Sequence, residues 1–352
     1  MSVGQEIELK LRMNRSEEIA ALVQDPALET FSVEPWQKDM LLSTYYDTPD
    51  KALLKSRLTF RVRKAGVAYE ATVKGGGKSS GGLHERQEWN VDLTAPEASV
   101  GAFQNTVIYP LLTTTVKEAS LEPLFTTEFL RHRLLLRYGD SLIEAAVDQG
   151  TIVGKEKTDE LAELELELKE GDASDLLALG ALLAKTYSLQ LEKRSKFQRG
   201  LTAAGLPVTE SKVTGEDTLS LLLSFAEAEA AFCASGGSRL AAETVFQLWD
   251  KFIWRFLKKI GASPLKASAL DQLDQITQLY QPLREVFFLA EQMRRLAQEG
   301  KITAAYHKEL ATAFRQHKQK TRQKLLDYLA QGKTTAIILA LWSFLKQEQT
   351  HS

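Results

Sequence analysis

The sequence predicts an α+β N-terminal domain, an antiparallel eight-stranded β-barrel with flanking helices, followed by an all-α C-terminal helical bundle. Two observations predict this architecture. Up to about residue 200, apolar and polar residues alternate with the period of two that half-buried antiparallel strands show. Beyond residue 212, the period changes to that of an amphipathic helix. The 352 residues suffice for two domains with separate cores, which we place at 1–204 and 212–352.

Eight strand-like segments follow one another in the N-terminal part, separated by turn sequences such as Asp47–Asp50 and Gly75–Gly77. This many short strands indicates an antiparallel barrel or sandwich. Helical patterns lie between them at 16–25, about 97–119 and 173–188, the last with Asp172 or Ser174 as a candidate N-cap. The predicted strands are 5–13, 40–47, 57–64, 67–75, 84–93, 126–137, 141–148 and 161–169.

The C-terminal part reads as about six helices packed as antiparallel hairpins. The helices are separated by Gly and Pro residues, which end helical patterns. A linker is expected near Gly205-Leu206-Pro207. The predicted breaks are Gly236-Gly237, Gly261–Pro264, Gln281-Pro282, Gly300 and Gly332.

Composition describes a folded protein, with 44% apolar residues, 26% charged residues and a net charge of -2. Residues 212–352 hold 19 Lys and Arg against 14 Asp and Glu, which leaves 25 against 32 in the N-terminal part. The mild basic excess of the helical part predicts a solvated surface, with an anion-binding face as the alternative. The overall balance predicts no nucleic-acid partner.

The single Cys233 excludes a disulfide framework and a cysteine-based metal site. The N-terminal segment lacks the pattern of a secretory signal, and the longest apolar run, around 336–342, is too short to span a bilayer. These features predict a cytoplasmic protein with no membrane contact.

The run from Glu6 to Lys10 places its charges on one face of an extended strand. Alternate side chains of a strand share a face, so Glu6, Glu8 and Lys10 lie opposite Ile7 and Leu9. One interpretation is an ordinary sheet with its charged face in solvent. The other is a barrel whose interior is lined with charge.

The same alternation recurs in later strands, and its distribution favours the lined interior. Surfaces usually intersperse both signs, whereas arginine dominates some of these strands and glutamate others. Three glutamates spaced by about 7 Å on one strand face need a compensating cation. The alternating sets are Arg61 and Arg63; Glu70, Thr72 and Lys74; His84, Arg86 and Glu88; Arg131 and Arg133; Glu144 and Asp148; and Glu163, Glu165 and Glu167.

These residue types suit a metal bound together with a polyanion. Carboxylate oxygens are the preferred ligands of Mg²⁺ and Mn²⁺. The arginine fork binds phosphate oxygens bidentately and keeps its charge at working pH. A barrel with carboxylates on one wall and cations on the others would form a hydrophilic tunnel for a metal–polyphosphate complex.

At this point the chain resembles the CYTH superfamily of triphosphate tunnel metalloenzymes, which includes thiamine triphosphatases and class IV adenylate cyclases. Within it, the nearest likeness is to bacterial inorganic triphosphatases that join a CYTH domain to a helical CHAD domain. The C-terminal half resembles CHAD by position and helix content, although it is poor in histidine. The matching motifs, over about residues 3–204, are Glu6–Lys10, Tyr45–Pro49, Arg61–Arg63, Thr72–Lys74, Gly82–Glu88, Asp148–Gly150, Glu163–Leu168 and Ser195–Gly200.

The resemblance implies roles for individual residues. Glu6, Glu8 and Lys10 are implied as catalytic, while Glu88 and Glu144 support the site. The implied metal ligands, for Mg²⁺ or Mn²⁺, are Glu6, Glu8, Asp148, Glu163, Glu165 and Glu167. The implied substrate-binding residues are Lys10, Arg61, Arg63, Lys74, Arg86, Arg131, Arg133 and Lys196.

The resemblance implies metal-dependent hydrolysis of inorganic triphosphate, a small polyphosphate, to pyrophosphate and phosphate. A second ion or a carboxylate would activate water; Lys10 is the alternative if neighbouring cations lower its pKa. A thiamine triphosphatase or a class IV adenylate cyclase is the enzymatic alternative, with Tyr45, Tyr46, Trp36 or Trp89 free to stack a ring. A non-catalytic polyphosphate-binding module, with polyphosphate or protein contact through the helical domain, is the other alternative.

Overall fold

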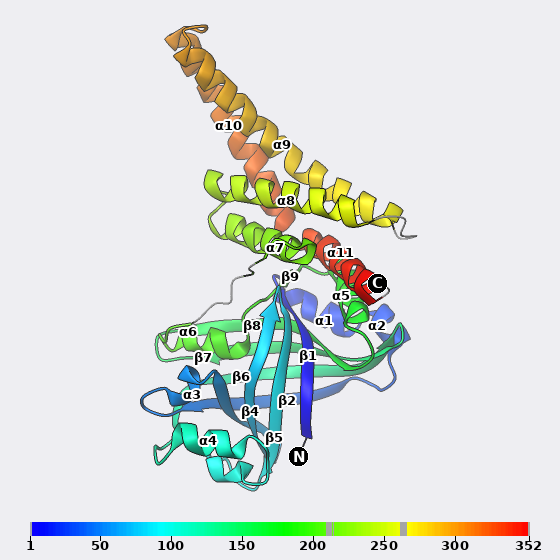
Figure 1. Cartoon of the computed structure of the whole chain (residues 1–352), viewed down its shortest axis with the longest axis vertical. Helices are drawn as coiled ribbons and strands as arrows, with labels where there is room; N and C mark the ends of the chain where they lie inside the picture. Colours follow the sequence, from blue (N-terminus) through cyan, green and yellow to red (C-terminus); the bar gives the residue numbers. More distant parts are fainter. Residues whose placement is uncertain (1, 209–212, 214, 261–265, 351–352) are drawn as a thin grey trace. The chain divides into compact units, whose positions relative to one another are not determined.

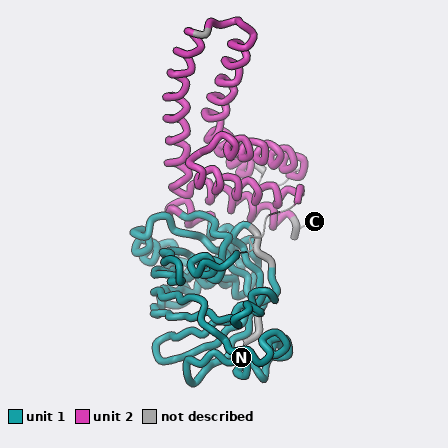
Figure 2. The backbone as a smooth tube through the Cα atoms, turned by 90° about the vertical axis from the view of Figure 1, so that its left-hand side faces the viewer, with its two compact units in different colours: residues 1–180, 189–212 teal, residues 181–188, 213–352 magenta. Residues whose placement is uncertain are grey.

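The computed structural model describes residues 2–208, 213, 215–260 and 266–350. The chain divides into two compact units, coloured separately in Figure 2: residues 1–180 with 189–212, and residues 181–188 with 213–352. The division passes through helix α5 (Ala173–Thr186).

The first unit contains the predicted closed antiparallel barrel of eight strands (Figure 1). The strands neighbour one another in the order β5-β4-β3-β2-β6-β7-β8-β1, and β1 pairs with β5 to close the barrel. A short ninth strand, β9 (Leu189–Leu191), was not predicted and pairs with the end of β1. The barrel strands are β1 (Ser2–Met13), β2 (Gln37–Asp47), β3 (Leu58–Ala65), β4 (Ala68–Ser80), β5 (Leu83–Leu93), β6 (Glu122–Tyr138), β7 (Ser141–Val153) and β8 (Thr158–Glu170).

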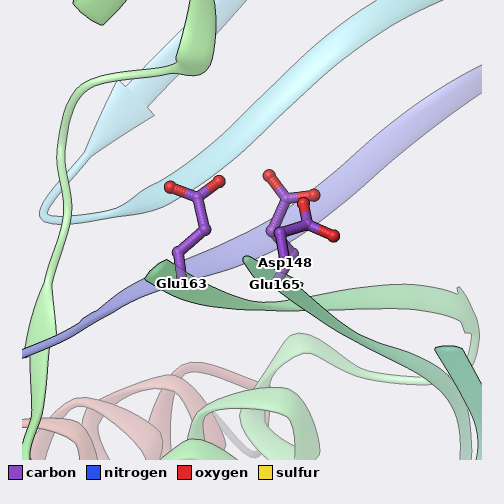
Figure 3. Close-up of side chains that lie close together, drawn as sticks. All are labelled: Asp148, Glu163 and Glu165. Atoms are coloured by element: carbon purple, nitrogen blue, oxygen red, sulfur yellow. The ribbon is translucent and has the colours of Figure 1, made fainter. Parts of the chain in front are cut away.

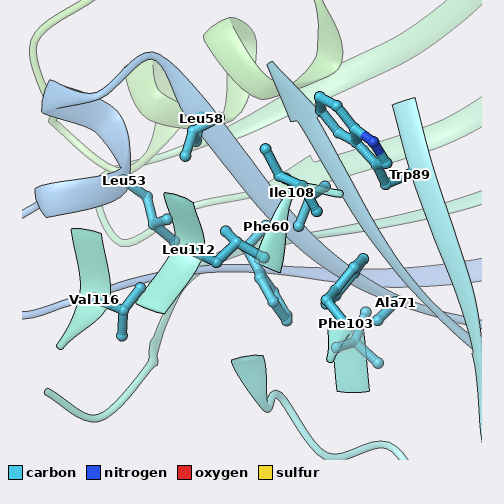
Figure 4. Packing of buried hydrophobic residues seen from close by; sticks show 11 residues of the cluster. Leu53, Leu58, Phe60, Ala71, Trp89, Phe103, Ile108, Leu112 and Val116 are labelled. Carbon is cyan, nitrogen blue, oxygen red and sulfur yellow. The ribbon is translucent and has the colours of Figure 1, made fainter. Parts of the chain in front are cut away.

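The apolar residues of β3, β4 and β5 pack outside the barrel, against short helices (Figure 4). Phe60 and Val73 are buried there against Phe103 of η2 (Val100–Phe103) and Leu112 of α4 (Tyr109–Val116). The alternate side chains of the same strands consequently point inward. This outer core therefore fixes which face of each strand lines the interior.

Helix α6 (Lys196–Ala203) contacts β6, β7 and β8 and carries two buried cations to the barrel. Its N-terminus is fixed by a capping box between Ser195 and Gln198. A Cβ at Gly200 would overlap the Phe125 ring, so glycine allows the helix to approach β6 closely. This approach places Lys196 beside the barrel interior.

Short helices connect the strands, and one prediction among them was wrong. The segment 97–119 is not one helix, because it forms η2 (Val100–Phe103) and α4 (Tyr109–Val116), and Pro110 occupies the first turn of α4. Three short helices were not predicted: α2, α3 and α6. The remaining elements are η1 (Ser16–Glu18), α1 (Ile19–Val23), α2 (Pro26–Phe31) and α3 (Ala52–Lys55).

The second unit is helical, as predicted. Its large side chains, among them Phe225, Trp249, Tyr280 and Trp342, are buried at its centre. No helix in the described part of the chain combines the length and apolar character needed to cross a membrane. The helices are α7 (Thr218–Ala234), α8 (Arg239–Lys259), α9 (Lys266–Gln298), α10 (Ala304–Leu329) and α11 (Lys333–Thr350).

The predicted helix break at Gln281-Pro282 was wrong, because α9 continues through Pro282. An internal proline costs about 3 kcal/mol in a helix. Pro282 itself is exposed, while Tyr280 and Leu283 on either side are buried in the core. Packing of these neighbours outweighs the cost of the proline. The breaks at Gly236-Gly237, Gly300 and Gly332 fall between helices, and the one at 261–264 lies outside the described residues.

A buried carboxylate, Glu229, lies in the helical core without a cationic partner among the described residues. It accepts hydrogen bonds from the Tyr280 hydroxyl (2.6 Å) and the Thr334 hydroxyl (2.5 Å). Burial raises the pKa of Glu229 even though both hydroxyls oppose the shift. The ionised form is therefore less favourable in the folded chain than in the unfolded chain.

We expect Glu229→Gln to reduce the loss of stability that this unit undergoes as pH rises. A raised folded pKa gives stability that is present below the unfolded pKa and is lost as pH rises through the folded pKa. Hydrogen exchange of α7, α9 and α11 in the whole chain, corrected for intrinsic rates, measures this at about pH 5 and pH 8. The exposed Glu243→Gln is the control. An unchanged pH dependence in Glu229→Gln would contradict the expectation.

Candidate functional site

A charged cavity of about 420 Å³ lies among the inward-facing residues of the barrel. Eight cations and seven carboxylates line it, but only two aromatic residues, Tyr45 and Phe197. Threonine, serine, asparagine and alanine complete the wall. The cations are Lys10, Arg61, Arg63, Lys74, Arg86, Arg131, Lys169 and Lys196; the carboxylates are Glu6, Glu8, Glu70, Glu88, Glu144, Glu165 and Glu167.

Strand register explains how the charges of β1, β7 and β8 meet. Glu8 pairs with Glu167, which pairs on its other side with Glu144, so three carboxylates form a row across three strands. One step along β1 and β8 on the same face, Lys10 pairs with Glu165. The cross-strand spacing of about 5 Å makes these side chains neighbours on the inner face, and Lys10 contacts Glu165 directly.

Asp148, Glu163 and Glu165 form a buried carboxylate trio on β7 and β8, with oxygens within 4.8 Å of one another (Figure 3). Lys196 contacts all three, at 2.7, 2.5 and 3.0 Å respectively. Arg131 lies 2.6 Å from both Asp148 and Glu165, and Lys10 also contacts Glu165. In this arrangement the trio holds three cations of the cavity wall in place, Lys10, Arg131 and Lys196.

The electrostatics of the trio follow from these contacts. Burial acts to raise the pKa of Glu165, but Lys10, Lys196 and Arg131 bring it well below its ordinary value. Burial raises the pKa of Glu163, and Lys196 only partly offsets this. Glu165 is therefore the carboxylate on which the three cations converge.

The row Glu8–Glu167–Glu144, together with Glu6, forms a second acidic group, and its members line the cavity. Lys169 lies 2.7 Å from Glu167 and 3.9 Å from Glu144, while Lys74 lies 2.6 Å from Glu6. Burial raises the pKa of Glu167, and the nearby Glu6 and Glu144 add to the effect. Carboxylate oxygens of this kind can coordinate a divalent cation.

Lys10 forms ion pairs, and these determine whether it can activate water, the alternative role predicted for it from the sequence. Burial alone would lower the pKa of Lys10, but Glu165, Glu8 and Glu163 raise it well above its ordinary value. The condition under which Lys10 would deprotonate water, a pKa lowered by neighbouring cations, is therefore not met. Lys10 is a fixed cation of the cavity wall.

His84 is fully buried on β5, and its pKa is lowered to about 3 by burial and by the nearby Lys10 and Arg86. Its ring is consequently neutral at ordinary pH. The Nδ1 atom lies 3.0 Å from Nη2 of Arg86. Burial, together with Arg61 and Arg131, likewise lowers the pKa of Arg63 to about 9, which leaves it charged below that pH.

Most residues predicted for the site line the cavity, and three do not. Asp148 and Glu163 are fully buried in the adjoining trio. Arg133 lies outside the cavity lining because it is two residues, about 7 Å, farther along β6 than Arg131. Its side chain is 43% exposed and pairs with Asp39 at 3.4 Å.

Several residues of the site were not predicted. Lys169 continues the alternation of Glu163, Glu165 and Glu167 on β8, so the pattern could have indicated it. Arg199 follows Lys196 by three residues on α6, contacts Glu163 at 3.2 Å and Asp159 at 2.9 Å, and is buried. Tyr45, predicted from the sequence only as a candidate for stacking a ring, packs on Phe125 and Phe197 at one side of the cavity, and no charge pattern reveals this contact.

The closed antiparallel barrel and its charged cavity place the chain in the class of β-barrel proteins whose inward-facing side chains enclose a polar cavity. The chain belongs to the CYTH domain family, whose model matches residues 4–201.

Similar proteins were found by sequence and by structure. An inorganic triphosphatase of Haemophilus influenzae is 35% identical over 196 residues, which cover 56% of this chain. The match spans only 54%, about half, of that relative's length. A Hippeastrum protein, described as a candidate adenylyl cyclase with a dominant triphosphatase activity, is 18% identical over 58% of this chain and 97% of its own, with a TM-score of 0.41. The solved PH1819 protein of Pyrococcus horikoshii is 17% identical over 55% and 98%, with a TM-score of 0.35.

Proposed function

We propose that the chain hydrolyses inorganic triphosphate to pyrophosphate and phosphate with the help of Mg²⁺ or Mn²⁺. The observation that carries the proposal is the cavity wall, in which eight cations and seven carboxylates surround a space with only two aromatic residues. A linear polyphosphate with bound metal presents both signs of charge and has no ring to stack. The family and the name of the Haemophilus influenzae relative support the same reading.

The acidic row would hold the metal. Glu6, Glu8, Glu144 and Glu167 offer oxygen donors on the cavity wall. A bound divalent ion supplies charge neutralisation of phosphate oxygens and a lower pKa for bound water. Asp148, Glu163 and Glu165 were predicted from the sequence as metal ligands, but we assign them a different role. Their oxygens already contact Lys10, Arg131 and Lys196, so the trio holds these cations.

The cations would bind the phosphate groups and stabilise charge on the leaving pyrophosphate. Lys10, Arg131 and Lys196 are fixed by the trio, so they are pre-organised before substrate arrives. Pre-organised charges stabilise a transition state without reorganisation during the reaction. We propose residues 1–204 as the catalytic domain and residues 212–352 as an accessory helical domain.

The test compares turnover of inorganic triphosphate, ATP and thiamine triphosphate with Mg²⁺ and with Mn²⁺. We expect inorganic triphosphate to show the highest kcat/KM and metal removal by EDTA to abolish turnover. Preference for ATP with a cyclic product would instead support an adenylate cyclase, and preference for thiamine triphosphate would support that phosphatase. Binding of triphosphate without turnover under any condition would support a binding module.

A further inference from the structure

Two arginines of the cavity, Arg63 and Arg86, differ from its other cations because neither makes an ion pair with any described residue. The other six lining cations each contact a carboxylate, for example Lys74 with Glu6 at 2.6 Å and Arg61 with Glu70 at 3.6 Å. Their charge is already compensated within the wall. The charges of Arg63 and Arg86 are compensated least.

Each of these arginines is held by a fully buried, uncharged acceptor. Nε of Arg63 donates to Oγ of Ser43 at 3.0 Å. Nη2 of Arg86 donates to Nδ1 of His84 at 3.0 Å. Because a guanidinium can only donate hydrogen bonds, Nδ1 of His84 accepts, and the ring proton is on Nε2.

The choice of a neutral acceptor matters for anion binding. A carboxylate in the place of Ser43 or His84 would orient the arginine equally well but would also cancel its charge. A neutral acceptor orients the guanidinium and leaves its charge available to a ligand. Arg61 and Arg131 add further positive charge near Arg63. An anion bound there would therefore also relieve the repulsion among these three arginines.

We propose that His84 and Ser43 are positioning residues that hold Arg86 and Arg63 as the primary anchors of the polyanion. The inference rests on the proposed function, because it assumes that the cavity takes a polyphosphate. It adds that part of the binding site is formed before any metal arrives. Tripolyphosphate therefore binds the metal-free chain, and it does so mainly through Arg63 and Arg86.

The test measures tripolyphosphate binding to the whole chain by calorimetry in EDTA, then steady-state turnover with Mg²⁺. His84→Leu keeps a similar volume but removes the acceptor, and we expect about tenfold weaker binding, because Arg86 loses the charge-assisted hydrogen bond that orients it. KM should rise by more than kcat falls. His84→Asn, whose Oδ1 can replace Nδ1, should restore most of the affinity. Ser43→Ala gives the same test at Arg63.

A double-mutant cycle distinguishes positioning from a general structural role. If His84 acts through Arg86, His84→Leu should add little to the loss in Arg86→Met. If His84→Leu, Ser43→Ala and the wild type bind tripolyphosphate equally well, the inference is overturned, whereas the proposed function is unaffected. If His84→Leu does not fold, tripolyphosphate binding by Ser43→Ala alone tests the inference. Absence of both turnover and tripolyphosphate binding in the wild type would instead refute the proposed function.

Discussion

Replacing Glu6 and Glu8 together with glutamine is expected to reduce triphosphate turnover by about 100-fold or more, since removing one well-placed electrostatic group from an active site costs about 10²–10³ in rate. Both side chains line the cavity, and Glu8 belongs to the row that continues through Glu167 and Glu144. Glutamine keeps their length but provides one neutral oxygen donor. The loss should appear as a weaker response of turnover to Mg²⁺ or Mn²⁺ concentration.

The same double variant separates an enzyme from a binding module. Glu6 forms an ion pair with Lys74, and Glu8 forms one with Lys10. In the variant the positive charges of both lysines are therefore less compensated. Metal-free tripolyphosphate binding should therefore persist or strengthen while turnover is lost. Glu85→Gln is the matched control, because Glu85 alternates with His84 and Arg86 on β5 and does not line the cavity. Full turnover in the double variant would exclude the acidic row as the metal site.

The barrel could be predicted because its strands carry a local signal. Alternation with a period of two is set by neighbouring residues. Apolar residues such as Phe60 and Val62 pack in the outer core, so the residue between them, Arg61, faces the cavity. The ends of the strands were predicted less well. The strand β7 continues through Gly150 to Val153, beyond the predicted residue 148, because it pairs with β6 and β8 over that length.

The pairing of charges within the site depends on contacts between distant segments, which the sequence does not show. Asp148, Glu163 and Glu165 carry the residue types of a metal site. Lys196, which neutralises them, comes from α6 and arrives by a close approach that Gly200 permits. Arg133 shares the alternation of Arg131 but lies beyond the cavity. Only register and barrel closure distinguish these cases.

Replacing Glu165 with glutamine is expected to destabilise the barrel by about 3–5 kcal/mol, the usual cost of removing one partner from a buried ion pair. Glu165 contacts Lys10, Arg131 and Lys196, and all three cations are buried or nearly so. Without its charge, they repel one another, and Asp148 and Glu163 cannot compensate all of them. Hydrogen exchange of β1, β7 and β8 in the whole chain at neutral pH, followed over a series of urea concentrations, measures the loss.

A second substitution tests whether uncompensated charge is the cause. Lys196→Met in the Glu165→Gln background removes the cation that contacts all three members of the trio, so it should recover part of the stability even though it deletes the ion pairs with Asp148 and Glu163. Cavity formation or lost packing would instead make the double variant less stable than either single variant. A Glu165→Gln barrel as stable as the wild type would show that the fold does not depend on the charge of Glu165, and the assignment of Glu165 as the carboxylate on which the three cations converge would have to be abandoned.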